Sequence, residues 1–202
     1  MQSNQLEPLD SPTQEAIARV YDLVDPPLWL VTSSDGTHRG GLIATFVVRA
    51  SIVSGLPRVL IGVAKQHRTW KLIEDSGRFA LHLLYSDQID LIWRFGLDSG
   101  ADLDKFAHLA AQRTPGSSPL VPDALAWLDC RVEEKMESGD RTIYLAAVES
   151  GAANGRAQPL TAGQLYANAP EERRHMLDAL YARDARIDAE AILAWRAARG
   201  ST

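Results

Sequence analysis

The residues best suited to bind an anion lie together in one short loop, Lys65–Thr69, which reads Lys-Gln-His-Arg-Thr. The apolar run Pro57–Ala64 before the loop predicts a strand, and Trp70–Asp75 after it predicts a short helix. A helix N-terminus carries unpaired backbone N–H groups and partial positive charge, so it can hold a phosphate. The loop adds two cations and a hydroxyl donor. The alternative is structural: Thr69 caps the helix while the basic side chains remain in solvent.

A second stretch, Arg39–Phe46, places the adjacent glycines Gly40 and Gly41 before an apolar run. Glycine lets another group approach the backbone closely. A flat heteroaromatic ring needs such a surface when its carbonyls and nitrogens bond to backbone groups. The alternative is a hairpin turn followed by an ordinary strand.

The sequence lacks the residue patterns of metal sites, nucleotide-binding loops and catalytic triads. The five histidines show no metal-ligand spacing with acidic residues or with the single cysteine, Cys130, so we predict no metal site. No GxGxxG motif, Walker loop or Ser-His-Asp arrangement is present. One cysteine cannot form an intrachain disulfide, and its place in the apolar run Trp127–Val132 predicts a buried, inert thiol.

The composition is that of a globular protein, with 46% hydrophobic and 23% charged residues among 202. This length favours one domain over two. The formal net charge of -5 argues against a general polyanion binder, so we expect no nucleic-acid partner and only local phosphate recognition. No apolar run approaches membrane-spanning length, and Met1–Asp10 has no signal pattern. We therefore expect a cytoplasmic protein that does not associate with a membrane.

The elements that must position these residues are short β-branched runs separated by turns, with helices inserted between them. Because the strands do not alternate as βαβ units, an antiparallel barrel or α+β fold is favoured over a doubly wound sheet. Six strands are predicted, at Leu28–Thr32, Leu42–Ala50, Pro57–Ala64, Phe79–Leu84, Ala126–Val132 and Thr142–Val148.

Several helices accompany the strands. A helix capped by Ser11 is expected to bury an apolar stripe on one side. Asp87–Phe95 and Asp102–Ala111 have helical spacing, and the tail Pro170–Arg199 predicts two helices with a solvated, salt-bridged face. The stripe of the first helix consists of Ile17, Val20, Tyr21 and Val24.

Taken in order, these stretches resemble the flavin reductase-like family, the FMN-binding split barrels, over roughly residues 25 to 166. Four segments and a tripeptide carry the resemblance. Pro27–Ser33 resembles the family's first strand, and Gly41–Thr45 resembles its Gly-Met-Thr-Ala-Ser segment. Lys65–Thr69 with Ser76–Ala80 resembles its basic loop and next strand. Ala124–Cys130 with Gly139–Ile143 resembles its Leu-Ala-Trp-Leu-Glu-Cys strand and Gly-Asp-His-Thr hairpin, and Asp104-Lys105-Phe106 matches a family tripeptide.

The resemblance implies a mainly β (α+β) fold, a six-stranded antiparallel FMN-binding split β-barrel with inserted helices over residues 1–166 and a C-terminal helical extension over 167–202. It implies a homodimer with one FMN per protomer near the subunit interface. No side chain is given a catalytic role, because the flavin carries the chemistry. Two sets of residues are assigned to the cofactor: ring contacts from Gly41, Leu42, Ile43, Ala44 and Thr45, and phosphate or ribityl contacts from Lys65, His67, Arg68 and Thr69.

The implied function is that of a flavin reductase-type oxidoreductase. It would pass electrons from NADH or NADPH through bound flavin to an acceptor such as a downstream oxygenase. Three family hydroxyl residues are replaced, by Ile43, Phe46 and His67, and the hairpin histidine is replaced by Arg141. Arg141 can bind the phosphate of a dinucleotide or serve as a surface salt-bridge residue. These departures leave two alternatives open: an electron-transfer module without its own NAD(P)H activity, and a split barrel that has lost flavin and acts as an interaction protein.

Overall fold

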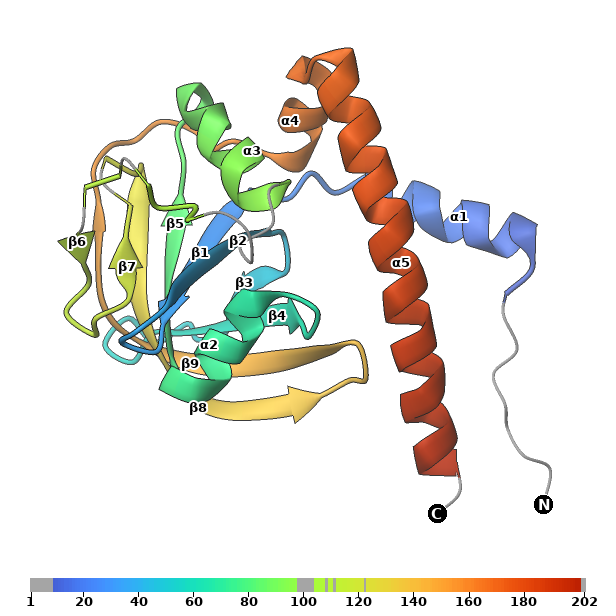
Figure 1. Ribbon diagram of the computed structural model, residues 1–202, viewed down its shortest axis with the longest axis horizontal. Helices are drawn as coiled ribbons and strands as arrows, with labels where there is room; N and C mark the ends of the chain where they lie inside the picture. Colours follow the sequence, from blue (N-terminus) through green and yellow to red (C-terminus); the bar gives the residue numbers. More distant parts are fainter. Residues whose placement is uncertain (1–8, 98–103, 108, 111, 122, 201–202) are drawn as a thin grey trace.

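A computed structural model of the chain describes residues 9–97, 104–107, 109–110, 112–121 and 123–200. Seven strands form one antiparallel sheet in the order β2-β1-β5-β8-β9-β4-β3. A two-stranded ribbon, β6 with β7, lies apart from it in the pairing (Figure 1). The strands are β1 Trp29–Ser34, β2 Arg39–Ala44, β3 Val47–Arg49, β4 Arg58–Ala64, β5 Arg78–Leu83, β6 Gln112–Arg113, β7 Pro119–Leu120, β8 Ala126–Glu137 and β9 Arg141–Ala153.

The two edge strands of the large sheet, β2 and β3, follow each other directly in the chain and are joined by Thr45 and Phe46. The three Cα–Cα steps across this junction span at most about 11 Å. The sheet must therefore curl until its edges meet. The Gly62 N–H donates to the carbonyl of Phe46 at 3.1 Å, so the junction is also held against β4. The result is a half-barrel that is split beside β2.

The predicted antiparallel sheet with inserted helices is confirmed, but the strand count is seven rather than six. The run Leu42–Ala50 was expected to form one strand, and it breaks at Thr45–Phe46 into β2 and β3 at opposite edges. Both residues at the break are strand formers by composition, so local propensity gives no sign of the change of edge.

The helices are α1 Ser11–Asp22, α2 Arg68–Ser76, α3 Ile89–Gly96, α4 Ala162–Asn168 and α5 Glu171–Gly200, with a 3-10 turn at Ser86–Gln88 before α3. Gly77, at a φ of 64°, ends α2 in the left-handed conformation that glycine adopts at little cost. The tail after Pro170 is one 30-residue helix, so the prediction of two helices there is wrong. The helix predicted over Asp102–Ala111 lies partly outside the described residues, and its described part forms a turn at residues 105–107.

The helix α1 differs from its prediction in two ways. Its N-cap is Asp10, whose carboxylate accepts from the Thr13 N–H at 2.9 Å, rather than Ser11. Its apolar stripe is not buried in the single chain, where Val20 is 61% and Tyr21 74% exposed. After the helix, Asp25 accepts hydrogen bonds from Thr161 and Gly163 at the start of α4. This anchor directs α1 away from the sheet, as Figure 1 shows.

The sheet is packed on both faces, because alternate residues of a strand point to opposite sides. Leu30 belongs to a cluster shared with α3, α4 and Leu177 of α5, whereas its neighbour Val31 belongs to a cluster shared with α2. Cys130 lies in the second cluster and is fully buried, as predicted. Burial raises the pKa of its thiol, which keeps the sulfur protonated and unreactive.

A buried histidine links the sheet to the segment that follows β7. The His82 side chain on β5 is fully buried. Its Nε2 accepts from the Val121 N–H at 3.2 Å, and its Nδ1 donates to the Leu30 carbonyl at 3.1 Å. Only the neutral ring with its proton on Nδ1 satisfies both partners. Burial lowers the pKa of His82 to about 4.

This histidine makes stability depend on pH. The ordinary pKa of histidine, 6.5, applies in the unfolded state, so the native state binds fewer protons than the unfolded state between about pH 4 and pH 6.5. The contribution of neutral His82 to the free energy of unfolding is complete above pH 6.5. It falls by up to about 3 kcal/mol as the pH drops through that window. Urea unfolding at pH 7.5, 6.5 and 5.5 measures it. The His82→Gln variant, which cannot titrate, should lose less stability over this range; an equal loss in both proteins would contradict the assignment.

Candidate functional site

The basic loop lies between the end of β4 and the start of α2. The His67 N–H donates to the Ala64 carbonyl at 3.1 Å, and the Trp70 N–H donates to the His67 carbonyl at 2.9 Å. The helix begins at Arg68 with His67 as its N-cap, and the His67 side chain makes no capping hydrogen bond. Thr69 lies inside the first turn and is only 3% exposed, so it is not the cap. The Trp70 N–H is thus satisfied by the His67 backbone, but the N-cap side chain caps no N–H of the first turn, and such a helix start can receive an anion.

Cations from two segments lie near this helix start, the basic loop itself and the turn at residues 105–107. Lys65 pairs with the Glu137 carboxylate, and Arg68 lies exposed at the first helical position. Lys105 is 8% exposed, and its Nζ donates to the Phe95 carbonyl at 2.8 Å. The Lys65 N–H also donates to the Asp140 carbonyl at 3.0 Å, which couples the loop to the β8–β9 hairpin.

The half-buried side chain of His67 lies in the field of several charged groups. Burial is the largest cause of a pKa below the ordinary value. Asp184 acts to raise this pKa, while Lys105, Arg183 and Arg141 act to lower it. An imidazole with a pKa below 6.5 is neutral near pH 7, so His67 can offer a phosphate a hydrogen bond but not a charge.

The glycines Gly40 and Gly41 have a packing role that the sequence did not reveal. A Cβ at Gly40 would lie 2.8 Å from Leu72 Cδ1 and 3.3 Å from Thr69 Oγ1, and one at Gly41 would lie 2.8 Å from the Phe95 ring. The groups that approach these glycines in the direction of a Cβ are the protein's own α2 and α3, and a ring contact at the Gly41 backbone stays a prediction. The same close packing brings the start of α2 against β2. The basic loop and the glycine-containing stretch Arg39–Phe46 therefore lie next to each other.

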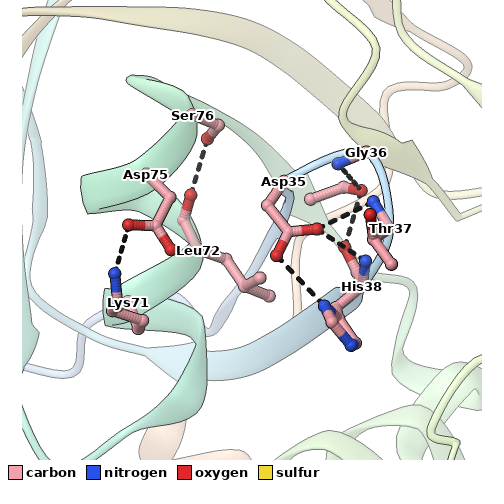
Figure 2. A network of polar contacts seen from close by, with 9 residues as sticks. Asp35, Gly36, Thr37, His38, Lys71, Leu72, Asp75 and Ser76 are labelled. Carbon is pink, nitrogen blue, oxygen red and sulfur yellow. Dashed lines mark hydrogen bonds and ion pairs between the residues drawn. The ribbon is translucent and has the colours of Figure 1, made fainter.

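The turn between β1 and β2 sets where these glycines lie. The Asp35 carboxylate accepts from the N–H groups of Thr37 and His38 at 2.8 and 2.6 Å. Figure 2 shows this network beside α2, with Leu72 directed toward the hairpin. These backbone hydrogen bonds, that of His38 first, lower the pKa of Asp35 to about 2, so the carboxylate stays ionised across the physiological range.

The predicted ring contacts are unequally accessible. Gly41 and Leu42 are buried, Ile43 and Ala44 are half-buried, and Thr45 is exposed. Because β2 is an edge strand, part of its backbone N–H and C=O groups point away from β1 and have no strand partner. This backbone edge, next to the start of α2, is the kind of donor set that a flavin ring requires. Which residues of β2 contact a ring stays a prediction.

Sequence reasoning missed the contribution of distant segments to this site. Arg39 pairs with Asp104 at 2.8 Å and lies 5.0 Å from the centre of the Phe106 ring. The match of residues 104–106 to a family tripeptide was the sequence feature that could have indicated this contact and the position of Lys105. Arg141 is held by Asp140 and, at 2.8 Å, by Asp188 of α5, which is the salt-bridge role that the sequence left open. No local pattern pointed to Asp188.

Two further properties bear on the kind of protein this is. Among the described residues, no group of three or more His, Cys, Asp or Glu side chains is arranged to hold a metal ion. In the same part of the chain, no helix has the length and apolar character needed to cross a bilayer.

Comparison with known proteins identifies several similar chains. The model of the flavin reductase like domain matches residues 22–169. Diflavin flavoprotein A 1 of Synechocystis is 32% identical over 161 residues, which is 78% of this chain and 26% of that protein. The chain thus spans about a quarter of the length of this relative.

Two solved structures share the fold. Nitrilotriacetate monooxygenase component B from Mycobacterium thermoresistibile superposes with a TM-score of 0.64 at 25% identity, over 76% of this chain and 83% of that one. An NADH:FAD oxidoreductase of Streptomyces globisporus gives a TM-score of 0.62 at 25% identity, over 73% of this chain and 87% of that one.

The junction beside β2 yields a test of its packing. A Cβ at Gly62 would lie 2.2 Å from Phe46 Cδ1, so the ring must move in Gly62→Ala. We expect a loss of about 1–3 kcal/mol in the free energy of unfolding, measured with urea. The control Gly55→Ala has open space around the new methyl group and should change stability by less than about 0.5 kcal/mol. In the double variant Gly62→Ala/Phe46→Ala the losses should be less than additive; strict additivity would show that the ring does not pack on Gly62.

Proposed function

The chain belongs to the flavin reductase like domain family, and on that basis we propose that it is an FMN-binding oxidoreductase that passes electrons from NADH or NADPH through flavin to an acceptor. The observation that carries the proposal is the start of α2, where a helix without an N-cap side-chain hydrogen bond begins within a loop that contains Lys65, His67 and Arg68. In this proposal the flavin supplies the ring that accepts and donates electrons.

The residues present fit a flavin phosphate. Lys65 and Arg68 offset its negative charge, while the first-turn N–H groups and Thr69 provide hydrogen-bond donors. Neutral His67 adds a donor or acceptor without charge. Lys65 already pairs with Glu137, an exchangeable partner, since a half-exposed ion pair contributes only about 0–1 kcal/mol.

The ring would lie along β2 at the split in the barrel. Ile43 and Ala44 at the end of β2 are half-buried and Thr45 in the junction is exposed, and Phe46 follows them with its ring over Gly62. Apolar side chains here exclude water, and the backbone edge of β2 orients the ring. With Ile43 and Phe46 in place of two hydroxyl residues, orientation depends more on the backbone than on side-chain hydrogen bonds.

The choice of electron donor is the finer part of the proposal. The similarity to an NADH:FAD oxidoreductase supports a nicotinamide nucleotide as donor. The second candidate, an electron-transfer module without its own NAD(P)H activity, is favoured by one observation: Arg141 is already engaged by Asp140 and Asp188. The similarity to a monooxygenase component supports an oxygenase as acceptor.

We also propose a homodimer. The connection from β2 through β3 to β4 exposes several large apolar residues. Two of them, Val48 and Val53, line an apolar groove of about 300 Å³. Exposed apolar surface of this kind typically marks an interface. The exposed residues are Phe46, Val48, Ile52, Val53 and Leu56.

The proposed division into residues 1–166 and a helical extension falls inside α4. Leu165 of α4 and Leu177 of α5 lie in one buried cluster with Trp93. The extension is therefore proposed to act together with the barrel rather than as a separate unit.

Removal of the loop cations tests the phosphate site. In Lys65→Ala/Arg68→Ala we expect FMN to bind at least about tenfold more weakly, because two charge-assisted contacts are lost. Quenching of flavin fluorescence in a titration measures the dissociation constant. The matched control is Lys71→Ala on the same helix, where the lysine pairs with Asp75, and it should bind FMN as the unchanged chain does. Unchanged affinity in the double variant would place the phosphate elsewhere.

Turnover distinguishes the two candidate functions. With FMN bound, we expect NADH or NADPH to be oxidised catalytically, and absorbance at 340 nm follows the reaction. Saturable flavin binding without turnover would instead favour the electron-transfer module. If neither FMN nor FAD bound saturably, the chain would be a split barrel that acts through protein contacts alone.

A further inference from the structure

The helix α1 and the turn after it present an apolar stripe that stays exposed in the single chain. Val20 is 61%, Tyr21 74% and Val24 68% exposed, and Ile17 is the fourth member of the stripe. Their spacing of i, i+3, i+4 and i+7 places the four side chains on one side of the helix. Amphipathic helices that bind in apolar grooves use the same spacing for their anchoring side chains. The stripe therefore has the form of one half of a helix-in-groove contact.

The chain just after α1 is fixed in a direction that keeps this stripe off its own sheet. The Asp25 carboxylate accepts from the Thr161 hydroxyl and from the Gly163 N–H, both at 2.7 Å. The Leu28 N–H donates to the Leu160 carbonyl at 2.8 Å, and two prolines stand between these anchors. Figure 1 shows α1 extending beyond α5, away from the sheet. In the part of the chain that the structure describes, the stripe stays exposed, which points to a cover from another molecule.

A second apolar surface lies open at the connection from β3 to β4. It is a groove of about 300 Å³ in which the lining residues Val47 and Val59 are buried, whereas Val48 and Val53 are 48% and 52% exposed. Beside them, Ile52 is 91% exposed. An apolar groove bordered by exposed apolar side chains is a surface that a partner typically covers. The chain thus carries both halves of a helix-in-groove contact, and the two halves do not meet within one copy.

Charge favours this groove over a membrane as the cover of the stripe. The helix α1 carries Glu15 and Asp22 against one cation, Arg19, so its polar residues are acidic in excess. Helices that lie in a membrane interface instead have a basic polar face. The groove is lined by Arg49 and Arg58 in addition to its apolar residues. An acidic helix would there meet a basic rim, which is complementary in charge.

We propose that α1 is exchanged between two copies of this chain, with the apolar stripe of each α1 bound in the β3–β4 groove of the other copy. The inference rests on the proposed homodimer and assigns the element that joins its two halves. One contact covers both exposed surfaces, and a twofold axis repeats it, so that neither the stripe nor the groove stays open in the dimer.

The groove lies next to the proposed ring site. Trp29, which lines it, stands opposite Ala44 in the pairing of β1 with β2. Residues directly opposite each other in an antiparallel pair point to the same face of the sheet. Val47, also in the lining, follows the exposed Thr45 by two residues. The exchanged helix therefore borders the split beside β2, where the ring is proposed to lie.

Removal of the stripe tests its role in the dimer. Sedimentation velocity of the full chain over a range of concentrations gives the dimer dissociation constant. In Val20→Ser/Tyr21→Ser we expect this constant to rise at least about tenfold, because two apolar anchors are lost from the contact. Both side chains are exposed in the single chain, so the barrel should fold as before, and circular dichroism verifies this.

The matched control is Tyr181→Ser/Leu193→Ser on α5. These side chains are 66% and 55% exposed, but at 3.6 residues per turn they point to different sides of the helix and form no stripe. The control should keep the dissociation constant of the unchanged chain. An equal rise in both double variants would contradict a specific role of α1.

Cross-linking identifies the surface that the stripe contacts. Val20→Cys and Val53→Cys each add one exposed thiol, while the native Cys130 is fully buried and unreactive. We expect the two single variants, when co-expressed, to be joined by a short bismaleimide reagent into a covalent dimer. Neither variant alone should form one. A cross-link within Val20→Cys alone would overturn the proposal in favour of two α1 helices that pair with each other.

The remaining outcomes separate the inference from the homodimer on which it rests. A dimer that is unaffected by Val20→Ser/Tyr21→Ser, or that gives no cross-link between the co-expressed variants, would overturn the exchange of α1 and leave the homodimer in place. A chain that stays monomeric at every concentration would overturn the homodimer itself. If such a monomer bound vesicles of anionic lipid, and lost that binding in Val20→Ser/Tyr21→Ser, the stripe would belong to a membrane contact instead.

Discussion

The two-residue junction between β2 and β3 is the constraint on which the rest of the architecture depends. Because Thr45 and Phe46 must connect the two edges of a seven-stranded sheet, the sheet has to curl, and its curl leaves β2 without a partner on one side. An edge strand with unpaired backbone groups is usually a liability for a protein. Here the start of α2 lies against the first residues of that strand, so the exposed backbone becomes one wall of a candidate site.

The approach of α2 to β2 depends in turn on a single missing side chain. A Cβ at Gly40 would lie within 3.3 Å of both Leu72 and Thr69, so any larger residue would push the helix start away from the strand. The glycine that looked suited to a ligand thus serves the packing, and the packing serves the site. The Asp35 network fixes the turn before it, with Ser34 Oγ donating to the His38 carbonyl at 2.7 Å. Binding geometry is in this way set by groups that need not touch the ligand.

Features encoded over a few neighbouring residues could be predicted from the sequence. The strand–loop–helix order around Lys65–Thr69 and the buried thiol of Cys130 are such features, since apolar runs and turn residues report on local structure. The break at Thr45–Phe46 could not be predicted, because its residues favour a strand on either side. Nor could the contact of Asp188 with Arg141, which are 47 residues apart. The exposed stripe of α1 was mispredicted for a related reason: helical spacing shows that a face is apolar, not which surface covers it.

Local charge balance reconciles the proposed phosphate site with a net charge of -5. Lys65, Arg39 and Arg141 each have a carboxylate partner, in Glu137, Asp104 and Asp188 respectively. Because partly exposed pairs contribute little to stability, a cation can leave its carboxylate for a phosphate at small cost. A phosphate bound at this loop would also accept hydrogen bonds from the α2 N-terminus, which the carboxylates in these pairs do not. In the proposed site, the replacement of two hydroxyl residues by Ile43 and Phe46 leaves a ring with fewer side-chain partners. In the proposed site a ring therefore depends on the backbone edge of β2, so its orientation traces back to the junction that makes β2 an edge strand.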